Sequence, residues 1–189
     1  MRTAFFRSVT LTIIMLVMVG VVYPLAGWAV SEVAFHHQAD GSLTANGSTL
    51  IGQPWNNGTS INPMWFNGRP DADDPLVVNG VAGESGAANL GPRSKVLAQK
   101  VSALVAEWRA VGVTPTPDLV TSSGSGLDPD ISPLDAEVQI PMISHSRGLS
   151  PAVLRHLIKE QTHGAQLGFL GSPYVNVLAL NEALAALAK

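Results

Sequence analysis

The chain has 189 residues, of which 46% are hydrophobic and 13% are charged, and its formal net charge at pH 7 is −3. An acidic balance with no basic cluster excludes a nucleic-acid-binding surface. The absence of cysteine excludes disulfides, thiolate metal sites and a cysteine nucleophile.

The N-terminal region contains an uncharged segment, 8–30, that is long enough to cross a bilayer as a helix, which needs roughly 20 apolar residues. Arg2 and Arg7 precede this segment, whereas the next basic residue after it is Arg69. The positive-inside bias therefore predicts a cytoplasmic tail at 1–7, a transmembrane helix at 8–30 and a C-terminal domain outside the cytoplasm.

Three residues near the outer end of this segment are expected to pack in the membrane. Tyr23 and Trp28 are amphipathic aromatics that favour the headgroup region. Pro24 lacks a backbone donor, so it should loosen the last turns and favour a neighbouring helix beside it. The alternative is a cleaved signal peptide with a site at Gly27-Trp28-Ala29, although the apolar run exceeds the usual 7–15 residues.

The remainder is expected to form a connector at 31–40 and one extracytoplasmic domain at 41–189. Glycine, asparagine and proline punctuate the chain as far as Pro92, which predicts a loop-rich first half. Three aromatic residues in this half are the expected packing anchors: Trp55, Trp65 and Phe66.

The second half shows alternating helix and strand signals. Helices are predicted from the N-cap Ser94 to about Ala110, from Ser150 with Pro151 at its first position, and after the N-cap Asn181. Strands are predicted at Asp118–Thr121 and Tyr174–Leu180. This order predicts a transmembrane helix followed by a small α/β or α+β domain.

The segment Ser123-Gly124-Ser125-Gly126 is the most unusual motif of the domain. Its glycines permit close backbone approach, so its amides could hold an anion, and a structural turn is the alternative. Pro129 stands where a dinucleotide fingerprint needs glycine, and no Walker lysine or nucleophile elbow is present.

The other chemistry-bearing residues give weak signals. Asp128, Asp130, Ser132 and Asp135 resemble a calcium loop, but Pro133 and Gln139 occupy the positions that require glycine and glutamate. The five histidines are scattered without a zinc-protease spacing, and no catalytic triad is indicated. The sequence therefore does not predict an enzyme in its own right.

Several segments in order along nearly the whole chain resemble the C subunit of the bacterial Kdp potassium-transporting P-type ATPase. These are Tyr23-Pro24-Leu25, Gly41-Ser42-Leu43, Leu50-Ile51-Gly52-Gln53, 66–70, 85–92, 123–133, Gln139-Ile140-Pro141, Ser146-Arg147 and 175–181. One departure is Met142, because the family usually has a basic residue after Gln-x-Pro.

The resemblance implies a non-catalytic subunit that assembles with a channel-like potassium-conducting subunit and an ATP-hydrolysing subunit in the bacterial inner membrane. It implies that the chain stabilises this complex and raises the ATP affinity of the hydrolysing subunit, as a catalytic chaperone. No covalent cofactor is implied, ATP enters through the partner subunit, and potassium is the transported ion. Carried over by residue, the candidate nucleotide or partner contacts are Ser123, Gly124, Ser125, Gly126, Asp128 and Gln139.

The predicted orientation limits this role, because ATP is scarce outside the cytoplasm. We therefore expect any effect on ATP use to pass through the membrane as a coupling between conformations. Two other functions remain open at this point: a membrane-tethered envelope hydrolase that uses a serine and a histidine, and a solute- or metal-binding module of the envelope.

Overall fold

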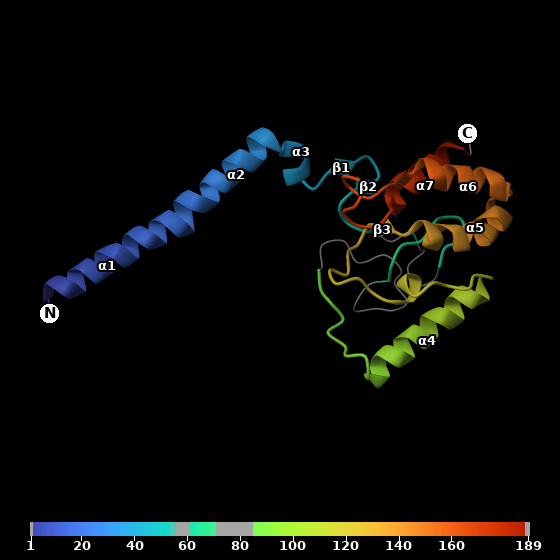
Figure 1. Ribbon diagram of the computed structural model, residues 1–189, viewed down its shortest axis with the longest axis horizontal. Helices are drawn as coiled ribbons and strands as arrows, with labels where there is room; N and C mark the ends of the chain where they lie inside the picture. The colour runs from blue at the N-terminus through green and yellow to red at the C-terminus, as the bar shows by residue number, and fades with distance from the viewer. Residues whose placement is uncertain (1, 54, 56–60, 71–84, 188–189) are drawn as a thin grey trace. The chain divides into compact units, whose positions relative to one another are not determined.

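The computed structural model describes residues 2–53, 55, 61–70 and 85–187 (Figure 1). The chain divides into two compact units, Met1–Leu43 and Thr44–Lys189. The first is mainly one long apolar helix, and the second is a small domain of helices and short antiparallel sheets.

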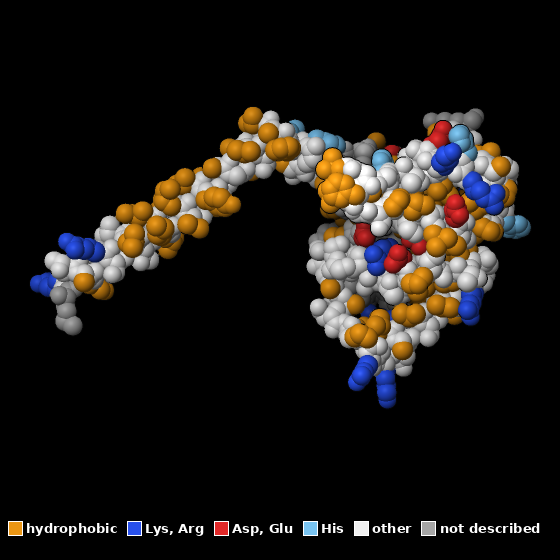
Figure 2. All heavy atoms as spheres, in the orientation of Figure 1, with side chains coloured by type: hydrophobic (Ala, Val, Ile, Leu, Met, Phe, Trp, Pro, Cys, Tyr) orange, Lys and Arg blue, Asp and Glu red, His pale blue; other side chains and the backbone are white. Residues whose placement is uncertain are grey.

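The N-terminal unit contains one continuous helical run, Arg2–Ala34, that is long and apolar enough to span a membrane. It comprises α1 (Arg2–Val17), a π-helical turn (Met18–Val22) and α2 (Tyr23–Ala34). None of its side chains is buried within the described chain. Figure 2 shows hydrophobic side chains along this helix and basic side chains at its N-terminal end.

The π-helical turn explains how Pro24 is tolerated inside the helix. Proline has no N–H and its ring clashes with the preceding turn. The turn Met18–Val22 lies directly before Pro24, and the amide of Tyr23 donates to the carbonyl of Met18, five residues earlier. This widened turn lets the helix continue past the proline, so the loosening expected at Pro24 is confined to one turn.

The predicted connector at 31–40 is largely helical. Helix α2 reaches Ala34, Phe35 interrupts it with φ −139° and ψ 34°, and α3 (His36–Ala39) follows. The amide of Phe35 still donates to the carbonyl of Ser31, and that of Ala39 donates to the carbonyl of Phe35. The break is therefore a single residue between two hydrogen-bonded segments.

The C-terminal unit is built around four helices and a three-stranded antiparallel sheet. The sheet has the order β3–β5–β4, with Asp130 opposite Asn176 and Thr162 opposite Val175. A second sheet pairs two short strands near the start of the domain. The element bounds are β1 (Leu43–Thr44), β2 (Gly47–Ser48), α4 (Lys95–Ala110), β3 (Asp130–Ile131), α5 (Pro133–Arg147), α6 (Pro151–Glu160), β4 (Thr162–His163), β5 (Tyr174–Asn176) and α7 (Val177–Ala186).

One hydrophobic core joins these elements. Its largest fully buried side chains are Trp108 of α4 and Phe66 of the loop-rich half. The indole Nε1–H of Trp108 donates to the carbonyl of Leu119 at 3.0 Å, so the one polar atom of this side chain is satisfied. Phe66, Trp55 and Trp65 all belong to or pack against the core, which confirms the prediction that they are packing anchors.

Two predicted helix starts are confirmed by their capping bonds. Ser94 Oγ accepts from the amide of Leu97 at the start of α4, and Ser150 Oγ accepts from the amide of Val153 at the start of α6. Pro151 occupies the first turn of α6, where its missing donor costs nothing.

Both predicted strands need correction. The segment Asp118–Val120 is a 3₁₀ turn, since Pro117 already has helical angles and its carbonyl accepts from the hydroxyl of Thr121. The second strand ends at Asn176, whose side-chain oxygen caps α7 by accepting from Ala179 N. Asn181 is therefore not the cap but a buried residue inside α7.

Helix α5 was not predicted, although its N-terminal signal is present. Ser132 and Asp135 form a capping box, and Pro133 occupies the first turn. Pro141 inside the helix hides this pattern, because an internal proline usually ends a helix. The buried face of α5, which includes Ile140, holds it in place despite the proline.

Two buried carboxamides fix the loop-rich half against these helices. Asn181 of α7 accepts from the amide of Phe66 at 2.9 Å and donates to its carbonyl at 2.8 Å. Gln139 of α5 does the same for Asn67, at 2.8 and 2.9 Å. Each carboxamide thus pairs with both the N–H and the C=O of one residue, as the backbone of a neighbouring strand would do in a sheet.

We predict that Asn181→Ala destabilises the domain by about 2–4 kcal/mol, because it leaves the buried N–H and C=O of Phe66 unpaired. Asn46→Ala is the matched control, since its exposed amide donates to Glu182 and its loss should cost under about 1 kcal/mol. Urea unfolding of the detergent-solubilised chain, followed by tryptophan fluorescence, measures both. Equal losses for the two variants would contradict the assigned role of Asn181.

Candidate functional site

The candidate site is the loop of residues 123–126, hereafter the Ser123–Gly126 loop, and Arg69 fixes the chain on both sides of it. Its guanidinium donates to the carbonyls of Thr121 and Ser122, at 3.2–3.4 Å. The same group lies 3.5 Å from the carboxylate of Asp128 beyond the loop. Arg69 therefore ties the start of the loop to its end.

The loop is also closed by its own serines. Ser123 Oγ accepts from the amide of Gly126 at 3.0 Å, and Ser125 Oγ accepts from the amide of Leu127 at 3.2 Å. Gly126 has φ 72°, a left-handed conformation that favours glycine. The hydroxyls thus satisfy one amide that the sequence suggested as an anion donor, that of Gly126, together with the amide of Leu127 beside the loop.

Two other segments that carry the family resemblance contact this loop. The amide of Gly86 and the hydroxyl of Ser85 both donate to the carbonyl of Ser125, at 2.9 and 3.0 Å. The amide of Gly52 donates to the carbonyl of Leu127 at 2.8 Å. A side chain at Gly52 would lie 2.8 Å from the carbonyl oxygen of Asp128, so this approach requires glycine.

The loop lines one wall of a cleft of about 540 Å³. Ser123 and Gly124 line it together with Ser122, residues 87–91 and Leu97 of α4. Ser125 is exposed, whereas Ser123 and Gly126 are buried. The cleft is open to a ligand or to a segment of another protein.

Asp128 and Gln139 do not line this cleft. Asp128 pairs with Arg69, and its Oδ1 accepts from the amide of Asp130 at 3.1 Å. Gln139 is completely buried and is bonded to Asn67 and to the carbonyl of Asp135. A direct ligand contact at Gln139 stays a prediction, and it would require these bonds to break.

Met142 stands where the family usually has a basic residue. Its side chain is 5% exposed and belongs to the hydrophobic core. It also lines a cleft of about 470 Å³ with Pro63, Val111 and His145. A charged side chain here would have to turn outward through that cleft, so methionine removes a charge from its wall.

The residues of the weak calcium pattern have other partners. Ser132 and Asp135 cap α5, and the hydroxyl of Thr116 donates to Asp135. Asp130 accepts from the side chain of Asn176 at 2.9 Å. The four residues are thus used in the fold, and they do not converge on a common point as calcium ligands do.

The three histidines of the C-terminal domain lie on separate elements. His145 is on α5, His156 on α6 and His163 on β4. His156 lies 3.2 Å from Glu160, and His163 stacks on Tyr174 with ring centroids 5.1 Å apart. The serine hydroxyls of the Ser123–Gly126 loop bond to each other and to backbone amides rather than to an imidazole.

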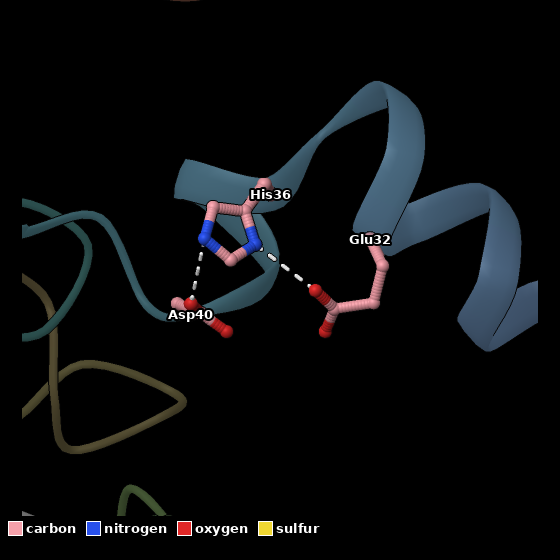
Figure 3. Close-up of side chains that lie close together, drawn as sticks. All are labelled: Glu32, His36 and Asp40. Atoms are coloured by element: carbon pink, nitrogen blue, oxygen red, sulfur yellow. Dashed lines mark hydrogen bonds and ion pairs between the residues drawn. The ribbon is translucent and has the colours of Figure 1, made fainter.

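His36 in the connector lies between two carboxylates. Its Nδ1 is 2.9 Å from Glu32 Oε2, and its Nε2 is 3.4 Å from Asp40 Oδ2 (Figure 3). These three side chains form the cluster, within the described residues, whose potential metal-ligand atoms lie within 4.8 Å of one another. Because the two ring nitrogens face different carboxylates, the arrangement suits a doubly protonated imidazole better than a single metal ion.

The hydrogen bond that His36 donates to Glu32 raises the pKa of His36 above its ordinary value of 6.5, and the charge of Asp40 raises it further. Since the folded pKa is raised, the stabilisation of this helical turn is complete below about pH 6.5 and is lost as the pH rises through the folded pKa. We predict that Glu32→Gln and Asp40→Asn each lower the pKa of His36, measured by NMR titration of the full chain.

Glu160→Gln is the control for this titration, because Glu160 pairs with His156 on α6 and should leave the pKa of His36 unchanged. A His36 pKa at or below 6.5 in the wild-type chain would refute the prediction, as would a pKa that neither connector variant changes.

Arg69 was missed as a site residue. It lies in the segment 66–70 that carries part of the resemblance, but its residue type alone predicts no role there. A signal was available, because Arg69 is the one basic residue between Arg7 and Arg93. Its guanidinium carries five N–H donors, a number that suits a residue that binds several backbone carbonyls.

Comparison with known proteins identifies the family. The family described as "KdpC: K+-transporting ATPase, c chain" matches residues 5–186. The chain is 45% identical over 186 residues to the potassium-transporting ATPase KdpC subunit of Sorangium cellulosum, and the match covers 94% of each chain. It is 43% identical to that of Gloeobacter violaceus, with 94% and 93% covered, and 38% identical to that of Dechloromonas aromatica over the full length of both.

The match includes both the long apolar helix and the domain with the Ser123–Gly126 loop, in agreement with the resemblance given by the sequence motifs. The chain belongs to the KdpC family, the c chain of the potassium-transporting ATPase complex.

Proposed function

We propose that the chain is a non-catalytic accessory subunit that stabilises the potassium-transporting ATPase complex and raises the ATP affinity of its hydrolysing subunit. Its partners are the potassium-conducting, channel-like subunit and the ATP-hydrolysing subunit. The observation that carries this proposal is the family match over both the apolar helix and the folded domain. In the part of the chain that the structure describes, the serines of the loop are bonded to backbone amides, and the histidines of the domain are dispersed.

The domain lies outside the cytoplasm in this proposal. Arg2 and Arg7 flank the N-terminal end of the helix, whereas Glu32 and Asp40 follow its C-terminal end. This asymmetry favours an N-terminus inside and a C-terminal domain outside an inner membrane. The domain then meets the extracytoplasmic mouth of the potassium-conducting subunit and is held there by the helix.

An effect on ATP use from that side is a coupling between conformations rather than a contact with the nucleotide. If the chain binds one conformation of its partners more tightly, it shifts their equilibrium towards it. Coupling free energies of about 1–3 kcal/mol change a ligand affinity roughly 5- to 150-fold. That range is sufficient for a chaperone effect on ATP affinity without any ATP bound to this chain.

Besides the contact made by the domain, the helix makes a second contact with the partner subunits inside the membrane. Pro24 and the π-helical turn before it leave backbone groups that a neighbouring helix can satisfy. Tyr23 and Trp28 are 76% and 63% exposed in the isolated chain, so both are free to pack against a partner. We place the contact with the membrane-embedded subunits on this part of the helix.

The Ser123–Gly126 loop is the proposed contact outside the membrane. Arg69, the two serines, Ser85 and Gly52 together fix its shape before any partner binds. A loop that is already ordered loses little conformational entropy on binding. Its cleft of about 540 Å³ provides room for a partner segment.

The test is to purify the complex in detergent with and without this chain and to measure its potassium-stimulated ATPase activity. We expect the KM for ATP to rise about 5- to 150-fold without the chain. A chain that purifies alone as an active hydrolase, or that leaves the KM for ATP unchanged, would contradict the proposal.

A steric variant tests the loop within the same assay. Gly124 is exposed, lines the cleft and has no atom within 4 Å of an added Cβ, so Gly124→Trp fills the cleft without disturbing the fold. Gly164→Trp is the matched control, because Gly164 is also exposed with open space around it. We expect about a tenfold loss of complex retention or ATP affinity for the first variant and none for the second. Equal complex retention and equal ATP affinity in the two variants would show that the loop is not part of the interface.

A further inference from the structure

A third cavity, of about 480 Å³, lies at the sheet β3–β5–β4, and none of its lining residues belongs to the Ser123–Gly126 loop. Its lining brings together one carboxylate and two aromatic rings from three neighbouring strands. The full lining is Thr49, Leu50, Pro129, Asp130, His163, Tyr174, Asn176 and Ala179. This volume is in the usual range of roughly 300–1,000 Å³ for sites that bind small molecules.

The carboxylate of Asp130 is fixed in position at this cavity. Asn176 Nδ2 donates to Asp130 Oδ1 at 2.9 Å and also to the carbonyl of Thr49 at 3.0 Å. Asn176 Oδ1 accepts from the amide of Ala179 at 3.1 Å, so the carboxamide cannot rotate without losing bonds. The carboxylate is therefore presented to the cavity in one orientation.

Asp130 has no cationic partner among the described residues. The ion pairs of the domain within 4.0 Å join Arg69 to Asp118 and Asp128, and His156 to Glu160. Burial raises the pKa of Asp130 above its ordinary value of 3.8, and the hydrogen bond from Asn176 offsets part of this rise. The charge of Asp128 raises the pKa a little further, and His163 lowers it slightly. A half-buried carboxylate in this state gains free energy when a cation approaches it.

The aromatic wall specifies what kind of cation suits the cavity. His163 and Tyr174 are paired across β4 and β5, and their rings stack with an interplanar angle of 23°. A planar guanidinium stacks on such a surface and is less strongly hydrated than an ammonium group. A hard metal ion would instead need several converging oxygen ligands.

We propose that the cavity lined by Asp130, His163 and Tyr174 binds a guanidinium group, which forms an ion pair with Asp130 and stacks on the aromatic pair. The group is supplied either by a free organic cation or by an arginine side chain of another subunit. This inference is independent of the proposed coupling to ATP use, since it rests on the contacts of this cavity alone.

The test is an NMR titration of the full-length chain in detergent micelles with ethylguanidinium, observing the ring signals of His163 and Tyr174. Ethylurea has nearly the same planar shape but no charge, and ethylammonium has the positive charge but no planar group. We expect saturable shifts with ethylguanidinium, weaker binding of ethylammonium and no saturation with ethylurea. Saturation at the same concentration for ethylguanidinium and ethylurea would overturn the proposal without any variant.

Asp130→Asn keeps an oxygen that can accept from Asn176 but removes the charge, and it should weaken ethylguanidinium binding at least tenfold. Asp118→Asn is the control for the same change of net charge, because Asp118 lies outside this cavity and should leave binding unchanged. Unchanged affinity in Asp130→Asn, with a wild-type circular dichroism spectrum, would also overturn the proposal.

The same titration on the assembled ATPase complex distinguishes the two sources of the group. If an arginine of another subunit occupies the cavity, the ring signals are already shifted and ethylguanidinium no longer binds. If the ligand is a free cation, the complex binds ethylguanidinium as the isolated chain does.

Discussion

The domain depends on the pairing of two buried carboxamides with the backbone of Phe66 and Asn67. Asn181 and Gln139 come from different helices, α7 and α5, and each satisfies one N–H and one C=O in the interior. Without these bonds the loop-rich half would have to expose the Phe66 side chain or bury unpaired backbone groups. Because Phe66 and Asn67 lead directly to Arg69, the same pairing also sets the position of the arginine that holds the Ser123–Gly126 loop. Core and candidate site are therefore linked by four residues of chain.

The parts of the fold with local signals were predictable. Ser94 and Ser150 predict the starts of α4 and α6, because an N-cap hydroxyl accepts a hydrogen bond from an amide only three residues away. The predicted strand Tyr174–Leu180 is too long, because a distant partner decides which of two asparagines caps the helix that follows. Asn176 and Asn181 are the same residue type five positions apart, and one caps α7 while the other pairs with Phe66, 115 residues away. Helix α5 survives Pro141 through its buried face, which a local pattern does not reveal.

The segment that forms the candidate site was predictable, but the hydrogen bonds and the cleft that give the site its geometry were not. The serines and glycines of 123–126 marked an unusual loop, and the structure adds that its hydroxyls close the turn while Ser123 and Gly124 face a cleft. Gln139 and Asp128 were grouped with the loop because the resemblance runs through them. In the structure Gln139 is a core residue and Asp128 a partner of Arg69. The charge asymmetry along the chain leaves the orientation of the helix a prediction, whereas the pairing of Arg69 with backbone carbonyls is visible only in the fold.

The central claim is that the folded domain acts on its complex from outside the cytoplasm. The chain has no cysteine, so a single introduced thiol reports on one position. Ser125 is exposed on the loop and Thr3 lies at the start of the helix, before the apolar segment. In intact spheroplasts that express the chain without its partner subunits, a membrane-impermeant maleimide should label Ser125→Cys at once and Thr3→Cys only after permeabilisation. Labelling of Thr3→Cys alone in intact spheroplasts would place the domain in the cytoplasm and contradict this account.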